Sequence, residues 1–531
     1  MTSLKGSELL VSCLENEDVE YVFHLPGEET LAVTDSLSKS HIKLITVRHE
    51  QAAAFMAGVY GRLTGRAGVC LATLGPGATN LATGIADANV DRAPLVALTG
   101  QASLEHVHKE YHQYVDVVSI LHPITKWNNR IQRADTIPEA VRKAFTVAEA
   151  EKPGSTHLEL PEDIADQITN EKPVLLRPGP EQPRPRTSQI RKAAQIINKS
   201  ETPMVLAGNG TIRAKASGPL GKFLEATKIP VAHTFMGKGA IPDDNPLSLY
   251  TIGLQEQTTV NKAFEQADLV IAVGYDFVEY APALWNPRSE KSIIHIDGTS
   301  AEVDTNYQPQ VQLVGEIGET LTYLTGQVKL RSADYVKRLR EAIVREAVAE
   351  SDADSYPLRP RRILRDLREV LAKDDILVSD VGEHKLWIAR YFPTYQPNTV
   401  LISNGYSSMG IGIPGAIVAK LVHPRRHVVA VVGDGGFLMT VHELETAIRL
   451  GVAITIIILR DNAYGSIKRK QLARYRRAVG VDFQNPDFVK LAEAFNARGY
   501  RPEKASELLP TLEEAVESSK PCVVDVAVDY T

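Results

Sequence analysis

The sequence is poor in cysteine and has no long apolar run. Its 531 residues include three cysteines, Cys13, Cys70 and Cys522, which lie far apart and form neither a disulfide framework nor a metal or redox motif. No uninterrupted apolar run reaches the roughly 18 residues of a transmembrane helix, and the N-terminus MTSLKGSELL lacks the apolar core of a signal peptide. We therefore expect a soluble, cytoplasmic protein of a reducing compartment that has no membrane partner.

The sequence also lacks an excess of basic residues. Its formal net charge at pH 7 is −6, and most of its Lys and Arg residues are dispersed. Nucleic-acid binding depends on clustered positive charge, so this balance argues against a nucleic-acid partner. One basic cluster, KRKQLARYRR at residues 468–477, is interpreted as a solvated loop or helix face.

Short apolar strands alternate with helical patterns in three blocks, which is typical of parallel α/β domains. At roughly 150 residues a domain, the length also suggests about three domains. We predict an α/β fold with three parallel-sheet domains, at residues 1–168, 189–327 and 356–531. A proline-dense linker at 172–188 separates the first two, and a charged helical segment at 332–354 joins the last two.

Two acidic motifs follow neighbouring strands of the third block. The triplet GDG at 433–435 ends the run HVVAVV, and Asp461 follows AITIIIL. A helix at about 441–450 must carry the chain back, so the strands lie parallel and both motifs reach one sheet edge. Magnesium is usually held by one or two carboxylates together with phosphate oxygens. We predict a magnesium diphosphate site with Asp434, Asp461 and the Ala463 carbonyl as ligands, although an Asp-Gly pair alone is more often a plain turn.

The first block contains two further elements of this kind. Glu50 lies between the apolar run IKLITV and a helix of small residues, where the simpler interpretation is an acidic residue in a first helical turn. Gly75-Pro76-Gly77 forms a tight loop between another strand and a helix from Asn80. Together with the GDG motif, these elements resemble the thiamine diphosphate enzyme superfamily.

That resemblance implies a fold in which a pyrimidine-binding domain and a diphosphate/Mg²⁺-binding domain flank a central Rossmann-like domain. It also implies that Glu50 binds the pyrimidine ring of thiamine diphosphate, while the diphosphate site comes from another subunit. The active site would then form across the interface of a homodimer, alone or within a homotetramer. Met409 matches the apolar residue that bends the cofactor, although a core methionine is the simpler interpretation. The cofactor-binding set so implied is Glu50, Gly75, Pro76, Asn80, Ser407, Met409, Gly433, Asp434, Gly435, Gly436, Asp461, Ala463 and Tyr464.

Within the superfamily, the whole chain most resembles the acetolactate synthases. Long stretches carry this resemblance, among them RHEQAAAFMAGVYGRLTGRAGV, ADANVDRAPLVALTGQ and KPGSTHLELPEDI. It implies decarboxylation of pyruvate on thiamine diphosphate and ligation of the enamine to a second 2-oxoacid, giving 2-acetolactate. The candidate catalytic residues are Glu50, Gln113, His112, Lys126 and Glu28.

Biosynthetic acetolactate synthases also bind FAD in the central domain, through a stretch resembling RFDDRVTG. This chain has YDFVEYAPALWNP at 275–287 instead, which resembles the FAD-independent, catabolic branch. The central block does contain Gly208-Asn209-Gly210, but the full G-x-G-x-x-G pattern is missing. We expect thiamine diphosphate and Mg²⁺ as cofactors, and no FAD.

The segment HLPGEETL leaves the reaction open. It places Glu28 and Glu29 where most acetolactate synthases carry a small residue and pyruvate decarboxylases an acidic one. A carboxylate there could donate a proton and release an aldehyde, whereas His112-Gln113, in place of a histidine pair, favours ligation. The alternatives are therefore a thiamine diphosphate-dependent 2-oxoacid decarboxylase, a carboligase with an aldehyde acceptor, or a catalytically idle thiamine-binding scaffold. The presence of Glu50 argues against the last.

Overall fold

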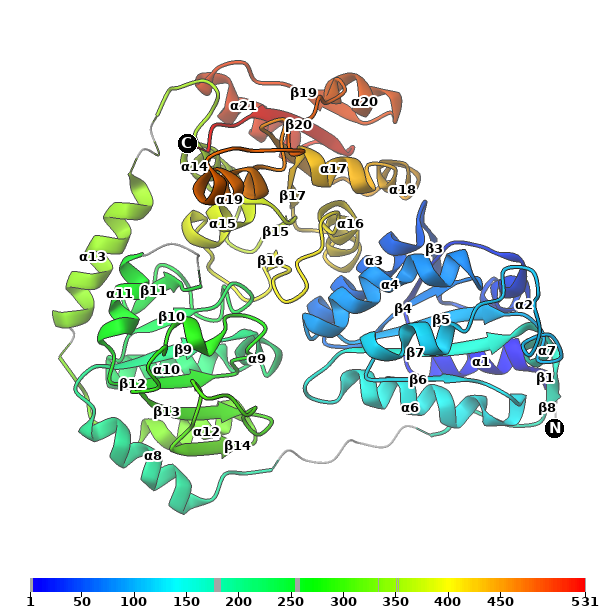
Figure 1. Ribbon diagram of the computed structural model, residues 1–531, viewed down its shortest axis with the longest axis horizontal. Coiled ribbons are helices and arrows are strands. Elements are labelled where there is room, and N and C mark those ends of the chain that lie inside the picture. Colours follow the sequence, from blue (N-terminus) through cyan, green and yellow to red (C-terminus); the bar gives the residue numbers. More distant parts are fainter. Residues whose placement is uncertain are drawn as a thin grey trace. The chain divides into compact units, whose positions relative to one another are not determined.

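Three six-stranded sheets carry the fold of this protein (Figure 1). The structure is a computed structural model that describes residues 3–175, 183–253, 258–332, 334–349, 351 and 353–530. Every strand pair within these sheets is parallel, which confirms the predicted α/β fold with three parallel sheets. Residues 176–182 of the predicted linker, and residues 333, 350 and 352 of the predicted charged helix, lie outside the described residues.

The N-terminal sheet has the strand order β3-β2-β4-β5-β7-β6. Its strands β4, β5 and β7 are buried along their whole length, as expected for parallel strands covered on both faces. A short antiparallel pair, β1 and β8, lies outside this sheet. The strands are β1 Leu4–Lys5, β2 Tyr21–His24, β3 Lys43–Thr46, β4 Gly68–Ala72, β5 Leu95–Gln101, β6 Trp127–Arg130, β7 Ser155–Pro161 and β8 Ile168–Thr169. The helices are α1 Gly6–Asn16, η1 Glu28–Thr30, α2 Leu31–Leu37, α3 Glu50–Thr64, α4 Pro76–Val90, α5 Val117–Leu121, η2 His122–Ile124, η3 Ala134–Thr136, α6 Ile137–Glu149 and α7 Glu162–Asp166.

The central sheet has the order β11-β10-β9-β12-β13-β14, so its strand order reverses between β9 and β12. In open α/β sheets, such a reversal is where ligands bind. The edge strand β11 is short, and its residues form no continuous apolar run in the sequence. The strands are β9 Pro203–Ala207, β10 Val231–His233, β11 Ser248–Thr251, β12 Leu269–Val273, β13 Ser292–Asp297 and β14 Val311–Val314. The helices are α8 Thr187–Lys199, α9 Asn209–Arg213, α10 Ser217–Thr227, α11 Thr259–Gln266, η4 Pro282–Leu284, α12 Ile317–Thr325 and the predicted charged helix α13 Asp334–Val348.

The C-terminal sheet has the order β16-β15-β17-β18-β20-β19, which repeats the topology of the N-terminal sheet. Its strand order reverses between β15 and β17, and that of the N-terminal sheet between β2 and β4. The strands are β15 Ile376–Ser379, β16 Val400–Ile402, β17 Val428–Gly433, β18 Thr455–Arg460, β19 Arg498–Tyr500 and β20 Cys522–Ala527. The helices are α14 Pro360–Val370, α15 Glu383–Tyr391, α16 Gly412–Val422, α17 Asp434–Thr440, α18 Glu443–Arg449, α19 Gly465–Tyr475, α20 Phe488–Ala494 and α21 Ala505–Val516.

The helix predicted at about 441–450 is present as α18. A second short helix, α17, precedes it and begins directly at Asp434, so Gly435 and Gly436 lie inside α17. The prediction that the two strands lie parallel is confirmed, since Gly433 pairs with Leu459 in the register of β17 and β18. The basic cluster at 468–477 falls mainly on α19, which has no buried residue, as the sequence indicated.

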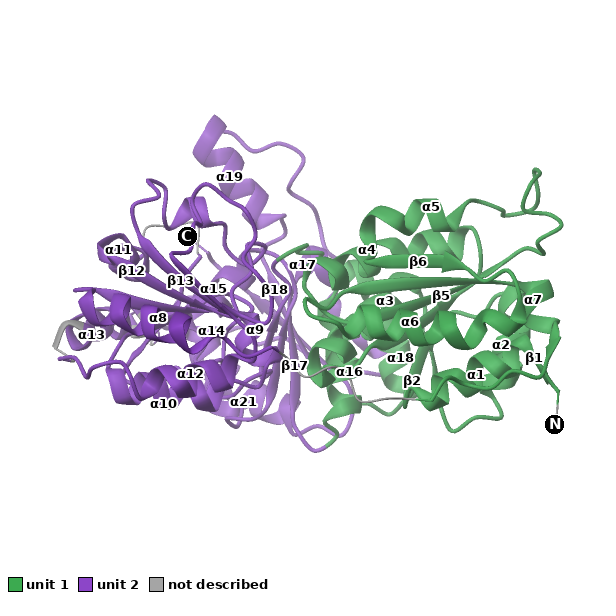
Figure 2. Cartoon of the chain, turned by 90° about the horizontal axis from the view of Figure 1, so that it is seen from below, with its two compact units in different colours: residues 1–179, 405–424, 438–453 green, residues 180–404, 425–437, 454–531 purple. Residues whose placement is uncertain are grey.

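The chain forms two compact units (Figure 2). Unit 1 contains the N-terminal sheet together with residues 405–424 and 438–453, and unit 2 contains the central and C-terminal sheets. Each sheet has its own apolar core. Among the described helices, none combines the length and the apolar character that crossing a membrane requires.

Candidate active site

The carboxyl ends of β17 and β18 bring a buried and a half-buried carboxylate together in unit 2. Asp434, the first residue of α17, is 1% exposed, and Asp461 follows β18. Asp434 Oδ2 accepts the backbone N–H of Asn462 at 2.7 Å. Burial raises the pKa of Asp434, and burial together with the charge of Asp434 raises the pKa of Asp461 to about 6. A bound cation would favour the charged form of both carboxylates, so this pair suits a metal ion.

The donor set at this edge fits magnesium. Ala463 is held in place because its backbone N–H donates to Asp461 Oδ1 at 3.3 Å. Among the described residues, no group of three or more His, Cys, Asp and Glu side chains could hold a metal ion. Two carboxylates and one carbonyl oxygen suit Mg²⁺, which completes its octahedron with phosphate oxygens and water. Asp434, Asp461 and the Ala463 carbonyl therefore fit the predicted role.

Glycine is required where the chain passes close to its neighbours at this edge. A Cβ on Gly435 would lie 2.8 Å from the Tyr464 ring, and a Cβ on Gly436 would lie 2.4 Å from Asp380 Oδ2. Gly433 is less restricted, since its Cβ would meet His384 at 3.4 Å. The GDG motif and the glycine after it therefore allow close packing of the loops around Asp434.

The structure adds two polar side chains that the sequence pattern did not single out. His384 lies in the first turn of α15, directly after β15, and burial lowers its pKa to about 4, so its imidazole is neutral. Asn485 Nδ2 donates to Asp434 Oδ2 at 2.8 Å. Within the described part of the chain, His384 Nε2 and Asn485 Oδ1 are buried atoms without a hydrogen-bond partner. Such atoms normally bind a ligand or water, so both fit a diphosphate–metal group at the reversal between β15 and β17.

Glu50 lies in unit 1 at the start of α3. It is 7% exposed, and Asn80 Nδ2 donates to its Oε2 at 3.0 Å. Asn80 can reach it because α4 begins at Pro76, not at Asn80 as the sequence pattern indicated; proline suits a first helical position, where no N–H is needed. A Cβ on Gly77 would lie 3.4 Å from Glu50 Oε1. The carboxylate is therefore held at a fixed place beside the Gly75-Pro76-Gly77 loop.

The loop from β5 to α5 packs against the same glycines. Gly75 has a φ of +52°, and a Cβ there would lie 2.4 Å from the Gln113 carbonyl oxygen. The backbone of Gln113 therefore lies beside the loop after β4, although Gln113 and its neighbour His112 are both exposed.

The side chain of Lys126 binds backbone carbonyls: its Nζ donates to the carbonyl oxygens of Ala150 and Lys152 at 2.7 and 2.8 Å. Burial lowers the pKa of Lys126 to about 8.

Of the two adjacent glutamates, Glu29 is the one that faces the sheet edge. Glu28 is exposed at the start of η1, whereas Thr73 Oγ1 donates to Glu29 Oε2 at 2.5 Å. Thr73 follows β4, so Glu29 lies at the reversal between β2 and β4. Sequence spacing could not separate the two residues, because the orientation of each depends on the turn geometry of η1.

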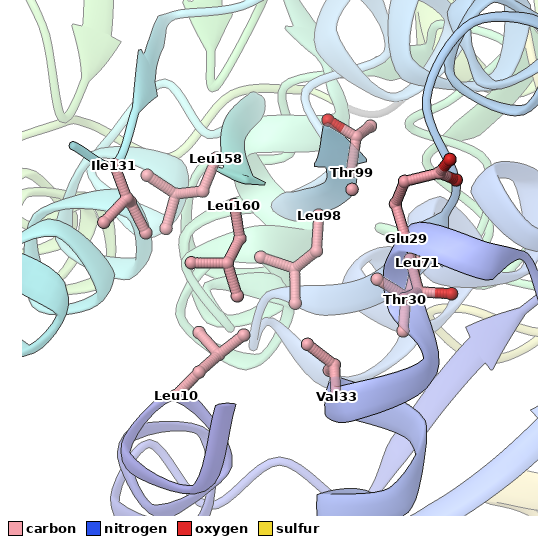
Figure 3. Close-up of a pocket in the computed structure, with 11 residues that line it drawn as sticks. Leu10, Glu29, Thr30, Val33, Leu71, Leu98, Thr99, Ile131, Leu158 and Leu160 are labelled. Carbon is pink, nitrogen blue, oxygen red and sulfur yellow. The ribbon is translucent and has the colours of Figure 1, made fainter. Parts of the chain in front are cut away.

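Glu29 also borders a small cavity beneath this edge (Figure 3). Leucine side chains face one another across it, and Glu29 and Thr99 lie at one side. Its volume of ≈ 10 Å³ has room for about one water molecule. This cavity is too small for a 2-oxoacid. The residues that line it are Leu10, Glu29, Thr30, Val33, Leu71, Leu98, Thr99, Gly100, Ile131, Leu158 and Leu160.

The loop that carries Ser407 and Met409 belongs to unit 1. The backbone N–H of Gly405 donates to Asp91 Oδ1 at 2.7 Å, and that of Ser408 donates to Asp87 Oδ1 at 3.3 Å. Ser407 has a φ of 59°, a conformation that few residues adopt without local support. Met409 is only half-buried, which disfavours its interpretation as a core methionine.

The reversal of the central sheet does not fit a dinucleotide phosphate. In sheets of this order, the phosphate binds the backbone amides of the first strand–helix turn, here Gly208-Asn209-Gly210. The N–H of Asn209 instead donates to both carboxylate oxygens of Glu279 at 3.1 Å, and the Thr234 hydroxyl also donates to this carboxylate. Glu279 is buried, and burial raises its pKa to about 7. The chain's own carboxylate therefore takes the place of an anionic ligand.

Comparisons with known proteins give one consistent result over the whole chain. Residues 4–120 match the family model "Thiamine pyrophosphate enzyme, N-terminal TPP binding domain", residues 190–324 match the central domain, and residues 380–526 match the C-terminal TPP binding domain. The chain is 37% identical to "Acetolactate synthase" of Bacillus subtilis, an alignment that covers 99% of this chain and 94% of that protein. It is 38% identical to "Acetolactate synthase, catabolic" of Raoultella terrigena, over 99% and 95%. It is 37% identical to "Probable acetolactate synthase large subunit" of Methanocaldococcus jannaschii, over 99% and 92%.

Proposed function

Because the chain belongs to the thiamine pyrophosphate enzyme family, we propose that it decarboxylates pyruvate with thiamine diphosphate and Mg²⁺ and joins the two-carbon product to a second 2-oxoacid, giving 2-acetolactate. The observation that carries this proposal is the similarity to acetolactate synthases over 99% of the chain. The similarity to the catabolic enzyme of Raoultella terrigena supports the FAD-independent branch. The donor set of Asp434, Asp461 and Ala463 supports the metal requirement.

The candidate residues around the diphosphate and the pyrimidine ring each have a chemical role in this proposal. When bound, thiamine diphosphate would supply a carbon nucleophile for the ketone of the 2-oxoacid. Asp434, Asp461 and the Ala463 carbonyl would hold the metal, and His384 and the amides at the start of α17 would bind phosphate oxygens. Glu50 holds a proton at the pyrimidine ring nitrogen, and Asn80 keeps its carboxylate oriented.

Gln113, Met409 and Ser407 complete the proposed site. Gln113 adjoins the Gly75 loop and is the candidate for orienting the 2-oxoacid. Met409 supplies an apolar surface for the cofactor, and Ser407 shapes the loop that carries it. His112, Lys126 and Glu28 remain candidates, but Lys126 Nζ is already bound by two carbonyls.

The proposed active site requires two copies of the chain. Glu50 belongs to unit 1 and Asp434 to unit 2; we propose that Glu50 of one subunit works with Asp434 of its partner, in a homodimer or homotetramer. Unit 1 exposes the apolar side chains of Tyr406, Leu438 and Met439 around the Met409 loop. An exposed apolar group of this kind is typical of an interaction surface.

The product formed from pyruvate tests the reaction. With Mg²⁺ and thiamine diphosphate added and FAD left out, we expect pyruvate to be consumed and 2-acetolactate to form, measured as acetoin that appears only after an acid step. Acetaldehyde alone would contradict the proposal and favour the second candidate, a 2-oxoacid decarboxylase. Glu29 favours that candidate, because its carboxylate lies at the sheet edge beside Thr73. No consumption of pyruvate would point to another 2-oxoacid or to an idle site.

The central domain supports a further expected result, the lack of bound flavin. The Glu279 carboxylate accepts the hydrogen bond that the Asn209 backbone N–H donates. The phosphate of a flavin dinucleotide would therefore have to displace this buried carboxylate from the turn. We expect the purified protein to be colourless, without flavin absorbance, and added FAD to leave both the rate and the thermal unfolding temperature unchanged. A yellow protein whose flavin is released on denaturation would contradict this expectation.

A further inference from the structure

A buried carboxylate on α18 holds the backbone just before α3. Glu443 is the first residue of α18, and its side chain is 0% exposed. Its Oε1 accepts the backbone N–H of Arg48 at 2.9 Å, and Thr446 Oγ1 donates to its Oε2 at 2.6 Å. Burial raises the pKa of Glu443, and the hydrogen bonds from Thr446 and from the backbone of Arg48 and His49 oppose that shift. All four residues belong to unit 1, so this contact lies within one compact body.

The other end of α18 binds the same stretch of backbone. Arg449 Nη2 donates to the carbonyl oxygen of Thr46, the last residue of β3, at 2.5 Å. Residues 46–49 are therefore fixed by two side chains of one short helix. Burying a carboxylate costs folding free energy unless the carboxylate is hydrogen-bonded. Here the Glu443 carboxylate accepts a hydrogen bond from the backbone of Arg48, which lies 395 positions away in the sequence.

The stretch that Glu443 holds determines where Glu50 lies. His49 is the N-cap of α3, and its Nδ1 accepts the N–H of Gln51 at 3.1 Å. Glu50 follows as the first helical residue, and its side chain must still meet Asn80. The backbone of residues 48–50 can therefore shift little without moving the Glu50 carboxylate. A displacement of about 1 Å at a reacting group can cost roughly 10²-fold in rate.

We propose that Glu443 is a positioning residue for Glu50, acting through the backbone of Arg48 and His49. This inference rests on the proposed function, in which Glu50 activates thiamine diphosphate. Glu443 fixes the start of α3, so that Glu50 meets the pyrimidine ring in one orientation. Thr446 in turn orients Glu443, since its hydroxyl binds the oxygen that is not used by Arg48.

The test compares Glu443→Ala, which removes the acceptor, with Glu443→Gln, which keeps an oxygen acceptor for the Arg48 N–H. Three quantities are measured in the full-length protein: the amide hydrogen exchange of residues 48–49, the dissociation constant of thiamine diphosphate with Mg²⁺, and the exchange rate of the thiazolium C2 proton in the bound cofactor. In Glu443→Ala, we expect faster amide exchange and a roughly 10- to 10²-fold slower C2 exchange, with cofactor affinity changed much less. In Glu443→Gln, we expect C2 exchange close to that of the wild type.

A matched control separates positioning from general stability. Glu17 is another buried carboxylate of unit 1, with a side chain 6% exposed, and it binds Arg142 at 2.6 Å without touching residues 46–50. Glu17→Ala should lower the thermal unfolding temperature but leave the C2 exchange rate at the wild-type value. If Glu443→Ala fails to fold, Thr446→Val provides the second variant, because it keeps the volume and removes the hydroxyl that orients Glu443. It should slow C2 exchange severalfold.

Two results would overturn the proposal: wild-type C2 exchange in both Glu443→Ala and Thr446→Val, or equally slow exchange in Glu443→Gln and Glu443→Ala. Glu50→Gln is measured in parallel. If it too exchanged at the wild-type rate, the role assigned to Glu50 would fail, and with it the proposed function. If only the Glu443 and Thr446 variants were unaffected, the proposed function would stand and the positioning role would fail.

Discussion

Glu50→Gln is expected to lower turnover of pyruvate by roughly 10²- to 10⁴-fold, the usual contribution of a positioned acid–base group. Glutamine has the same shape and can still accept the hydrogen bond that Asn80 donates, so the start of α3 should stay in place. What it loses is the carboxylate that holds a proton at the pyrimidine nitrogen. The measurement is kcat with pyruvate at saturating cofactor, together with the circular dichroism spectrum of the folded protein.

A second acidic residue provides the control for this variant. Glu139 is the third residue of α6 and thus also lies in a first helical turn, as Glu50 does in α3, but it is exposed. Glu139→Gln removes a similar interaction with the helix dipole, worth about 0.3–1 kcal/mol, and should leave kcat unchanged. Near-normal turnover in Glu50→Gln would refute the assignment of Glu50. If both variants lost turnover, the loss would be due to removal of a negative charge from a first helical turn, and not to the proton that Glu50 holds.

The sequence predicted the fold well because parallel sheets leave a strong pattern. Strands buried on both faces read as continuous apolar runs, and the two acidic motifs stand directly at the ends of such runs. The register of β17 and β18 then brings Asp434 and Asp461 to one edge. This part of the candidate site depends only on the local sequence and on the short helical connection between β17 and β18.

The remaining features depend on contacts that local sequence does not encode. His384 and Asn485 lie beside the metal ligands only because β15, β17 and the loop after α19 meet at one edge. The hydrogen bond from Arg48 to Glu443 joins residues 395 positions apart. A signal for His384 was present, since it follows the buried strand β15 as the GDG motif follows β17. For Glu443 the sequence offered only a glutamate at the start of a short amphipathic helix, which is usually a solvated position.

Asp434→Asn is expected to weaken the binding of thiamine diphosphate with Mg²⁺ by 10²-fold or more. Loss of a residue that merely supports a metal ligand typically costs about 10- to 100-fold, and Asp434 is proposed to bind the metal directly. Asparagine can still accept the Asn462 N–H, so the fold should persist. The measurement is the thermal shift: a ligand at 100 times its Kd stabilises a protein by about 2.7 kcal/mol, and at the same ligand concentration this stabilisation should fall to about 0.4 kcal/mol or less in the variant. Asp374→Asn, just before β15 and thus at the opposite end of that strand, should keep the full shift.

Mixing the two inactive variants then tests the proposal that the active site is shared between subunits. If Glu50 of one chain works with Asp434 of its partner, a mixed dimer of Glu50→Gln and Asp434→Asn has one site with both residues intact and one site with neither. Random assembly gives mixed dimers half of the time, so co-expressed variants should recover roughly a quarter of wild-type activity, although neither is active alone. A site built within a single chain would recover nothing, because each chain would then carry one defect in its own site. The same experiment therefore assigns both residues to one reaction and decides whether the active unit is the dimer.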